Sequence, residues 1–235
     1  MSEIKAILFD KDGTLFDFAA TWAPWAKEFV LRACDGDWDR AEAVGAAIGF
    51  DLVACEFASD SIAVAGTPGQ VTDALALHFP EQSRSQLLDH LNAEAANAVQ
   101  CEAVPLAPLL RRLRDRGLRL GVATNDAEHP ARAHLTTAGI AGMLDFIAGF
   151  DSGHGGKPQA GQLLAFAAYV DLPPEQVVMV GDSLHDLEAA RLAGMTPVAV
   201  LTGPASAEVL APHAEVVLPD VGHLPDWLNR RRLSQ

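Results

Sequence analysis

Cysteine is scarce in this chain, with only Cys34, Cys55 and Cys101 among 235 residues. An odd, widely spaced set of cysteines supports neither a disulfide framework nor a zinc site, whose ligands recur at short spacings. Reduced thiols that pack as small apolar side chains are therefore the simplest interpretation.

Long apolar runs are also missing from the sequence. No stretch approaches the roughly 20 apolar residues that a membrane-spanning helix needs. The N-terminus, MSEIKAILFD, lacks the basic stretch and the long apolar core of a signal peptide. We therefore expect a cytoplasmic protein that has no membrane partner.

Basic residues are few, at 17 Lys plus Arg against 31 Asp plus Glu, for a formal net charge of −14. Nucleic acid is excluded as an expected partner, because its binding proteins present a basic face. The segment from Asp17 to Glu102 is the most acidic part of the chain. If a small substrate carries a carboxylate, the basic residues of this segment are its candidate partners there: Lys27, Arg32, Arg40 and Arg84.

Strand and helix patterns alternate after residue 104. Apolar, β-branched runs predict strands at 118–125, 144–150, 176–183, 196–202 and 215–218. Helical patterns lie between and after them, at 105–117, 128–140, 158–172, 184–194, 206–214 and 224–231. This alternation predicts an α/β fold, a Rossmann-like parallel sheet with helices on both faces, which the strand at 4–9 also joins.

The segment at 17–103 has mostly helical patterns and no clear strand. Asp37 is placed to cap a helix that runs to Gly49. We predict that residues 1–16 and 104–235 form a catalytic core and that residues 17–103 form an inserted α-helical cap domain. Trp22, Trp25 and Phe29 recur at helical spacing in this segment, which favours a role in the cap core over a shelf for substrate.

Polar residues follow the predicted strands, at the carboxyl ends where functional groups gather in parallel sheets. They are Asp10 and Asp12, Thr124 and Asn125, Asp182 and Asp186, together with Lys157 in a glycine-rich loop. Clustered carboxylates repel one another, and Mg²⁺ would relieve that repulsion. A carboxylate also attacks phosphorus, and hydroxyl and ammonium groups hold phosphoryl oxygens. These residue types together indicate phosphoryl transfer.

Asp10 and Asp12 lie on either side of Lys11 and then Gly13. Because alternate side chains of an extended chain point the same way, we expect both carboxylates to face one pocket and Lys11 to face away, with little effect on chemistry. Gly13 lets the chain leave the strand in a tight turn.

Four short motifs in order, DKDGTL, VATND, GGKP and GDSLHD, resemble those of the haloacid dehalogenase superfamily, and its phosphoglycolate-phosphatase-like members most of all. The resemblance implies that Asp10 is the nucleophile and Asp12 the general acid/base. It implies that Thr124, Asn125 and Lys157 bind phosphate, and that Lys157 also neutralises the nucleophile. It also implies a metal site with four ligating residues: Asp10, Asp12 through its backbone carbonyl, Asp182 and Asp186.

The leading hypothesis is a Mg²⁺-dependent phosphatase that hydrolyses a small phosphorylated metabolite, phosphoglycolate-like, through an aspartyl-phosphate intermediate. A sugar phosphomutase of the same superfamily is the main alternative. A non-catalytic phospho-accepting signalling or binding protein is the alternative from another class, although receiver domains lack such a long helical insertion. The sequence leaves monomer and homodimer both open.

Overall fold

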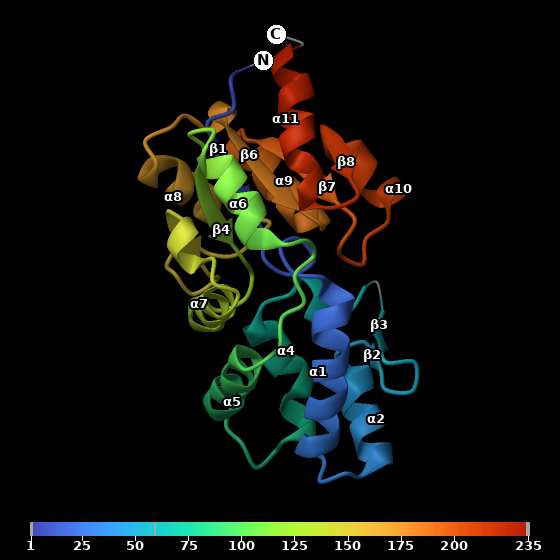
Figure 1. Ribbon diagram of the computed structural model, residues 1–235. Helices are drawn as coiled ribbons and strands as arrows, with labels where there is room; N and C mark the ends of the chain where they lie inside the picture. The colour runs from blue at the N-terminus through green and yellow to red at the C-terminus, as the bar shows by residue number, and fades with distance from the viewer. Residues whose placement is uncertain (1, 59, 234–235) are drawn as a thin grey trace.

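The computed structural model describes residues 2–58 and 60–233. Its main sheet consists of β1 (Ala6–Phe9), β4 (Arg119–Ala123), β5 (Phe146–Ala148), β6 (Val177–Gly181), β7 (Thr196–Val200) and β8 (Val216–Leu218). The strands lie in the order β5-β4-β1-β6-β7-β8, and every neighbouring pair is parallel. The predicted α/β fold with a parallel sheet is therefore confirmed (Figure 1).

Helices cover both faces of this sheet. They are α6 (Leu106–Arg114), α7 (Glu128–Thr137), α8 (Gly161–Tyr169), α9 (Leu184–Ala193), α10 (Ala207–Leu210) and α11 (Leu224–Leu233). In β1, Ile7 and Phe9 pack in one hydrophobic cluster with α6 and α11, while Ala6 and Leu8 pack in another with α8 and α9. All four side chains are fully buried, as expected for a central strand that is covered on both sides.

The segment after β1 is largely helical and has its own hydrophobic cluster. It contains α1 (Phe18–Ala33), α2 (Trp38–Ala47), α3 (Ile62–Ala65), α4 (Pro68–Leu75) and α5 (Arg84–Ala96). Asp37 caps α2, as predicted, by accepting a hydrogen bond from the Arg40 backbone N–H at 3.1 Å. The sequence shows no clear strand in this segment, yet β2 (Phe50–Asp51) and β3 (Glu56–Phe57) form a short antiparallel pair.

The chain enters and leaves this helical segment at one place. Phe16 forms an antiparallel bridge with Glu102, and the Asp17 backbone N–H donates to the Cys101 carbonyl at 2.8 Å. Figure 1 shows the helical segment beyond one end of the sheet, on the side away from both chain termini. The boundaries at residues 16/17 and 103/104 lie beside this bridge, and the division into core and cap remains a prediction.

Within the described residues, no helix combines the length and the apolar character that crossing a membrane requires.

Candidate active site

The polar residues that follow the strands meet at one pocket between the sheet and the helical segment. Asp10 and Asp12 come directly after β1, Thr124 after β4 and Asp182 after β6, and all four line this pocket. Asn125 and Lys157 line it as well. Because the strands are parallel, their C-terminal ends lie at one edge of the sheet, even though the strands are far apart in the sequence.

Three buried carboxylates form the floor of the site. One oxygen each from Asp10, Asp182 and Asp186 lie within 4.8 Å of one another. The Lys157 Nζ lies 2.6 Å from a carboxylate oxygen of Asp10 and 2.6 Å from one of Asp186. One ammonium thus bridges two of the three negative charges, and the cluster keeps an excess of negative charge.

Burial and the neighbouring charges shift the pKa values of the groups involved. Burial, together with the negative charge of Asp186, raises the pKa of Asp10 to about 7 even though Lys157 opposes the shift. Burial and the same neighbouring carboxylates raise the pKa of Asp182 well above its usual value. The pKa of Lys157 is raised, because its carboxylate partners outweigh the effect of burial. Burial is the largest cause of the two raised carboxyl pKa values, and the repulsion between the carboxylates adds to it.

The donor set suits a hard divalent cation. Carboxylate oxygens that converge this closely are the ligands preferred by Mg²⁺, which completes its shell with water and substrate oxygens. The side chains of Asp10, Asp182 and Asp186 therefore can hold a metal ion. The Asp12 side chain is outside this group, and its predicted contact through the backbone carbonyl remains a prediction.

Asp186 is fixed at the first turn of α9. Ser183 caps this helix, and its Oγ donates to Asp186 Oδ2 at 2.6 Å, while its backbone N–H donates to the same oxygen at 3.1 Å. The other oxygen, Oδ1, accepts from Lys157. The motif GDSLHD thus forms a capping box that presents one carboxylate oxygen to the site.

Asn125 joins two loops of the site. Its side-chain Nδ2 donates to the Lys157 carbonyl at 3.0 Å, and its Oδ1 accepts from the Lys157 backbone N–H at 2.7 Å. Thr124 is buried, and its Oγ1 accepts from the Asp126 backbone N–H at 3.1 Å. The structure therefore shows a positioning task for Asn125, and phosphate binding by Thr124 and Asn125 remains a prediction.

Gly13 allows Asp182 to approach the first motif. Its φ is +77°, and a Cβ at this position would collide with the Asp182 carboxylate. The glycine is needed for the turn, as expected, and also for this close approach, which the sequence alone did not indicate.

Lys11 contacts two carboxyl groups of the site. Its side chain is fully buried, and its Nζ lies 2.7 Å from Asp12 Oδ2 and 3.4 Å from Asp126 Oδ2. Lys11 is not among the residues that line the pocket, but its contact with Asp12 was not foreseen, and its small effect on the chemistry remains a prediction. Although burial acts in the opposite direction, Lys11 holds the pKa of Asp12 below its usual range. The pKa of Asp126 is raised to about 6, chiefly by burial.

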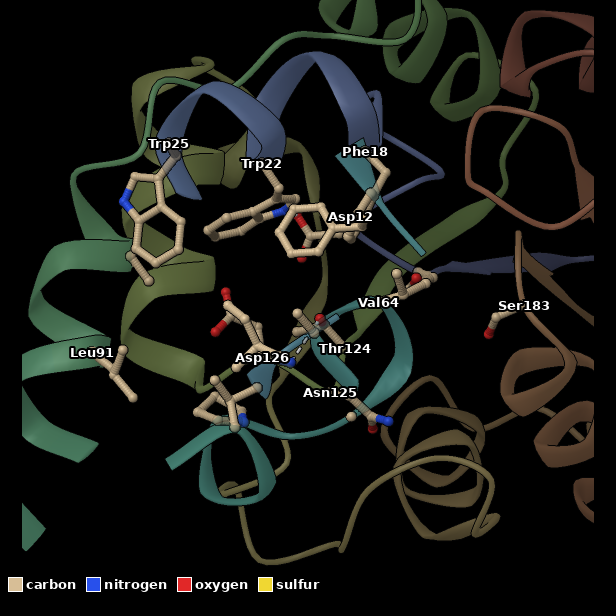
Figure 2. Close-up of a pocket in the computed structure, with 18 of the residues that line it drawn as sticks. Asp12, Phe18, Trp22, Trp25, Val64, Leu91, Thr124, Asn125, Asp126 and Ser183 are labelled. Atoms are coloured by element: carbon tan, nitrogen blue, oxygen red, sulfur yellow. Dashed lines mark hydrogen bonds between the residues drawn. The ribbon is translucent and has the colours of Figure 1, made fainter. Parts of the chain in front are cut away.

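Trp22 is a site residue that the sequence analysis assigned mainly to the cap core. Its indole Nε1 donates to Asp12 Oδ1 at 2.8 Å, so a residue of the helical segment holds the carboxylate predicted to act as acid/base. Trp22, Trp25 and Phe29 all line the pocket. Figure 2 shows Phe18, Trp22 and Trp25 on one side of this pocket and Thr124, Asn125 and Asp126 on the other.

Comparison with known proteins gives a family for this site. The model of the haloacid dehalogenase-like hydrolases matches residues 4–194. A curated phosphoglycolate phosphatase of Rhodospirillum rubrum is 32% identical over 228 residues, which cover 95% of this chain and 90% of the relative. The match therefore includes both the sheet and the helical segment.

Solved structures share the fold at low sequence identity. A candidate phosphoglycolate phosphatase of Lactobacillus delbrueckii subsp. bulgaricus has a TM-score of 0.70 at 20% identity, covering 97% of this chain and 99% of that one. A candidate β-phosphoglucomutase of Thermotoga maritima has a TM-score of 0.69 at 18% identity, with the same coverage. With the family model matched across most of the chain, the resemblance seen in the four motifs is confirmed: this protein is an enzyme that belongs to the haloacid dehalogenase-like hydrolases.

Proposed function

We propose that this hydrolase is a Mg²⁺-dependent phosphatase that cleaves a small phosphate monoester through an aspartyl-phosphate intermediate. Phosphoglycolate is the ester that the names of its curated relatives suggest. Uncatalysed hydrolysis of phosphate monoesters is extremely slow, so such an enzyme needs a nucleophile, charge neutralisation and an acid/base together.

The observation that carries the proposal is the position of Lys157 against Asp10. The Lys157 Nζ lies 2.6 Å from the Asp10 carboxylate, on the floor of the pocket. In the proposed reaction Asp10 attacks phosphorus, while Lys157 stabilises the negative charge of the phosphoryl oxygens. Thr124 binds one of these oxygens, and the Asn125 side chain fixes the position of Lys157 through two hydrogen bonds to its backbone.

Asp12 would act as the general acid and then as the general base. It lines the same pocket as Asp10, and Trp22 and Lys11 fix its carboxylate from two sides. In its protonated form, which Lys11 disfavours, Asp12 would give its proton to the leaving alkoxide, and the carboxylate would then take a proton from the attacking water. The water splits the aspartyl-phosphate and regenerates Asp10.

The metal site would be formed by Asp10, Asp182 and Asp186, whose oxygens lie close enough to bind one ion. When bound, Mg²⁺ would neutralise the negative charge of the transferring phosphoryl group. A bound cation would account for three carboxylates within one buried cluster that holds a single lysine.

The pocket lining gives no support to the sugar phosphomutase alternative. Among the described residues that line the pocket from the helical segment, Asn92 has the one amide side chain, and no side chain there carries a hydroxyl or a charge. A sugar phosphate presents several hydroxyl groups that would each need a hydrogen-bonding partner when buried. A non-catalytic binding role likewise finds no support in a site that contains a nucleophile, an ammonium group and an acid/base.

The test of this function is phosphate release from p-nitrophenyl phosphate with Mg²⁺ and with EDTA. We expect turnover that needs the metal and that disappears in Asp10→Asn, a variant of nearly the same size. Metal-independent turnover, or turnover retained in Asp10→Asn, would overturn the proposal.

A further inference from the structure

The wall of the pocket that faces the catalytic carboxylates is almost entirely apolar. Its members come from α1, α3, α4, α5 and β3, and from Ile48 directly after α2. They include Phe18, Trp22, Trp25, Phe29, Ile48, Phe57, Val64, Val71, Leu75 and Leu91. We infer that the preferred substrate is a phosphate monoester of a compact apolar alcohol, with an aromatic ring as its best leaving group, an inference that rests on the proposed phosphatase function.

The aromatic side chains of this wall have defined orientations. Trp25 and Phe29 are stacked, with ring centroids 5.2 Å apart, and Trp22 meets Trp25 edge-on at 5.2 Å. Phe18 meets Phe57 edge-on at 5.5 Å. Because these rings are held by one another, they offer a substrate ring a fixed surface for stacked or edge-on contact.

The wall reaches the reacting atoms. Trp22 Nε1 lies 2.8 Å from Asp12 Oδ1, so the indole ring is adjacent to the proposed proton donor. The leaving oxygen must lie beside Asp12 to receive its proton. The carbon atoms attached to that oxygen would then lie against Trp22, so even the first part of the leaving group enters apolar surroundings.

The hydrogen-bonding groups of this wall are mostly engaged elsewhere. Trp22 Nε1 donates to Asp12, and Trp25 Nε1 donates to the Glu94 carbonyl at 3.3 Å. Asn92 is the exception, because its side-chain oxygen is buried and has no hydrogen-bond partner among the described residues. One donor on the leaving group, such as a hydroxyl, would satisfy this oxygen.

The Lys and Arg side chains of the helical segment make their contacts outside the pocket. Arg84 pairs with Asp73 at 2.6 Å, Arg32 pairs with Glu94, and Arg40 donates to the His78 carbonyl at 3.2 Å. Lys27 lies over the Trp38 ring, 6.0 Å from its centroid. None of the four lines the pocket, so the expectation that they hold a substrate carboxylate finds no support.

A second negative charge on the substrate would therefore be poorly accommodated. On the sheet side, Lys157 is already paired with Asp10 and Asp186, and Asp126 adds a further carboxyl group to the pocket. His185 is the remaining basic side chain on that side. A carboxylate against the aromatic wall would lose its hydration, and among the described residues no Lys or Arg of the helical segment lines the pocket to replace it. Phosphoglycolate carries such a carboxylate, whereas a benzyl group does not.

The size of the pocket limits the leaving group. Its cavity volume is about 140 Å³, close to that of an apolar protein cavity that holds benzene. The phosphoryl group shares this volume with the leaving group, so the size it suits best is a single ring or a branched chain no larger than a ring.

The test compares benzyl phosphate with phosphoglycolate, two esters of primary alcohols that differ in the charge of the leaving group. With Mg²⁺ we expect kcat/KM for benzyl phosphate to exceed that for phosphoglycolate at least about tenfold, the scale on which apolar pockets discriminate. Val71→Lys adds a cation to the wall and should narrow this ratio. Leu77→Lys adds the same charge at a side chain that is 90% exposed and should leave the ratio unchanged.

The outcomes separate this inference from the proposed function. Preferred hydrolysis of phosphoglycolate by the wild-type enzyme would overturn the apolar-substrate inference and leave the phosphatase intact. If no ester is hydrolysed, the phosphatase function fails, and titration calorimetry with benzylphosphonate and phosphonoacetate tests the pocket alone. Tighter binding of benzylphosphonate would support the inference, and equal or tighter binding of phosphonoacetate would overturn it.

Discussion

The Nζ of Lys11 lies 3.0 Å from Nδ1 of His134, and Nε2 of the same ring lies 2.7 Å from the carbonyl oxygen of Ala95. An ammonium only donates and a carbonyl only accepts, so His134 must be neutral, with its proton on Nε2. Since Lys11 also contacts Asp12, this chain of bonds connects the proposed acid/base to α5 of the helical segment.

We predict that His134 stays neutral throughout the range in which histidine normally titrates. Burial, supported by the positive charge of Lys11, lowers its pKa to about 4 from an ordinary value of 6.5. In ¹⁵N NMR spectra, the ring nitrogens assigned by comparison with His134→Gln should show the Nε2–H tautomer and no titration from pH 7 to pH 5. A midpoint near pH 6.5 would contradict this arrangement.

The same shift implies a contribution of His134 to the pH dependence of stability. Above pH 6.5 the ring is neutral in both states, so it adds no pH dependence. Between pH 6.5 and about 4 only the unfolded chain binds the proton, so the folded state loses about 3 kcal/mol as the pH falls. Asp10 and Asp126 act in the opposite direction, because their raised pKa values favour proton uptake by the folded state. Denaturant unfolding of wild type and His134→Gln at each pH should therefore show the advantage of the wild type shrinking below pH 6.5.

Removal of Lys11 should destabilise the protein. Lys11→Met leaves the partly buried carboxylates of Asp12 and Asp126 without their shared cation. Breaking a fully buried ion pair from one side typically costs about 3–5 kcal/mol, and we expect a smaller loss here because both carboxylates keep some exposure to solvent. The double variant Lys11→Met with Asp126→Asn should recover part of the loss, since it removes one of the two unpaired charges. Denaturant unfolding of the four proteins measures this coupling, and strictly additive effects would argue against it.

Mg²⁺ should stabilise the wild-type protein through the carboxylate cluster. A ligand that binds only the folded state at 100 times its dissociation constant adds about 2.7 kcal/mol. Thermal unfolding should therefore shift upwards with Mg²⁺ and return with EDTA. Asp182→Asn removes one charged donor from the cluster and should lose most of this shift. An equal shift in this variant would mean that the ion binds elsewhere.

Gly13 and Gly117 form a matched pair that tests whether Gly13 is needed because the Asp182 carboxylate lies close to it. Both have φ near +80°, at +77° and +80°, but a Cβ at Gly117 meets no atom within 4 Å, whereas one at Gly13 collides with the Asp182 carboxylate. Gly117→Ala should cost about 1 kcal/mol from backbone strain alone. Gly13→Ala should cost more and should also abolish Mg²⁺-dependent turnover. Turnover at the wild-type level in Gly13→Ala would show that Asp182 tolerates displacement.

Much of this protein was determined by local patterns that the sequence displays directly. The alternation of strands and helices after residue 104 predicts the parallel sheet, because buried strands and amphipathic helices each have their own periodicity. The positions of Asp10, Thr124 and Asp182 follow from this, since parallel strands bring their carboxyl ends to one edge. Asp186 and Lys157 were found by their motifs, and their contacts with one another place them in the same cluster.

Other features were decided by tertiary structure alone. The buried position of Lys11 depends on Asp126 and His134, which lie more than one hundred residues away in the chain and approach it only in the folded protein. Trp22 shows the same limit: its helical spacing is that of a core residue, and only the position of α1 in the folded protein brings its N–H to Asp12. The apolar lining of the pocket also depended on how the helices pack. The sequence shows how many basic residues the helical segment has, but not that they lie outside the pocket lining. Spacing along a chain specifies local conformation, whereas charge pairing and pocket lining depend on distances that are set when separate elements pack together.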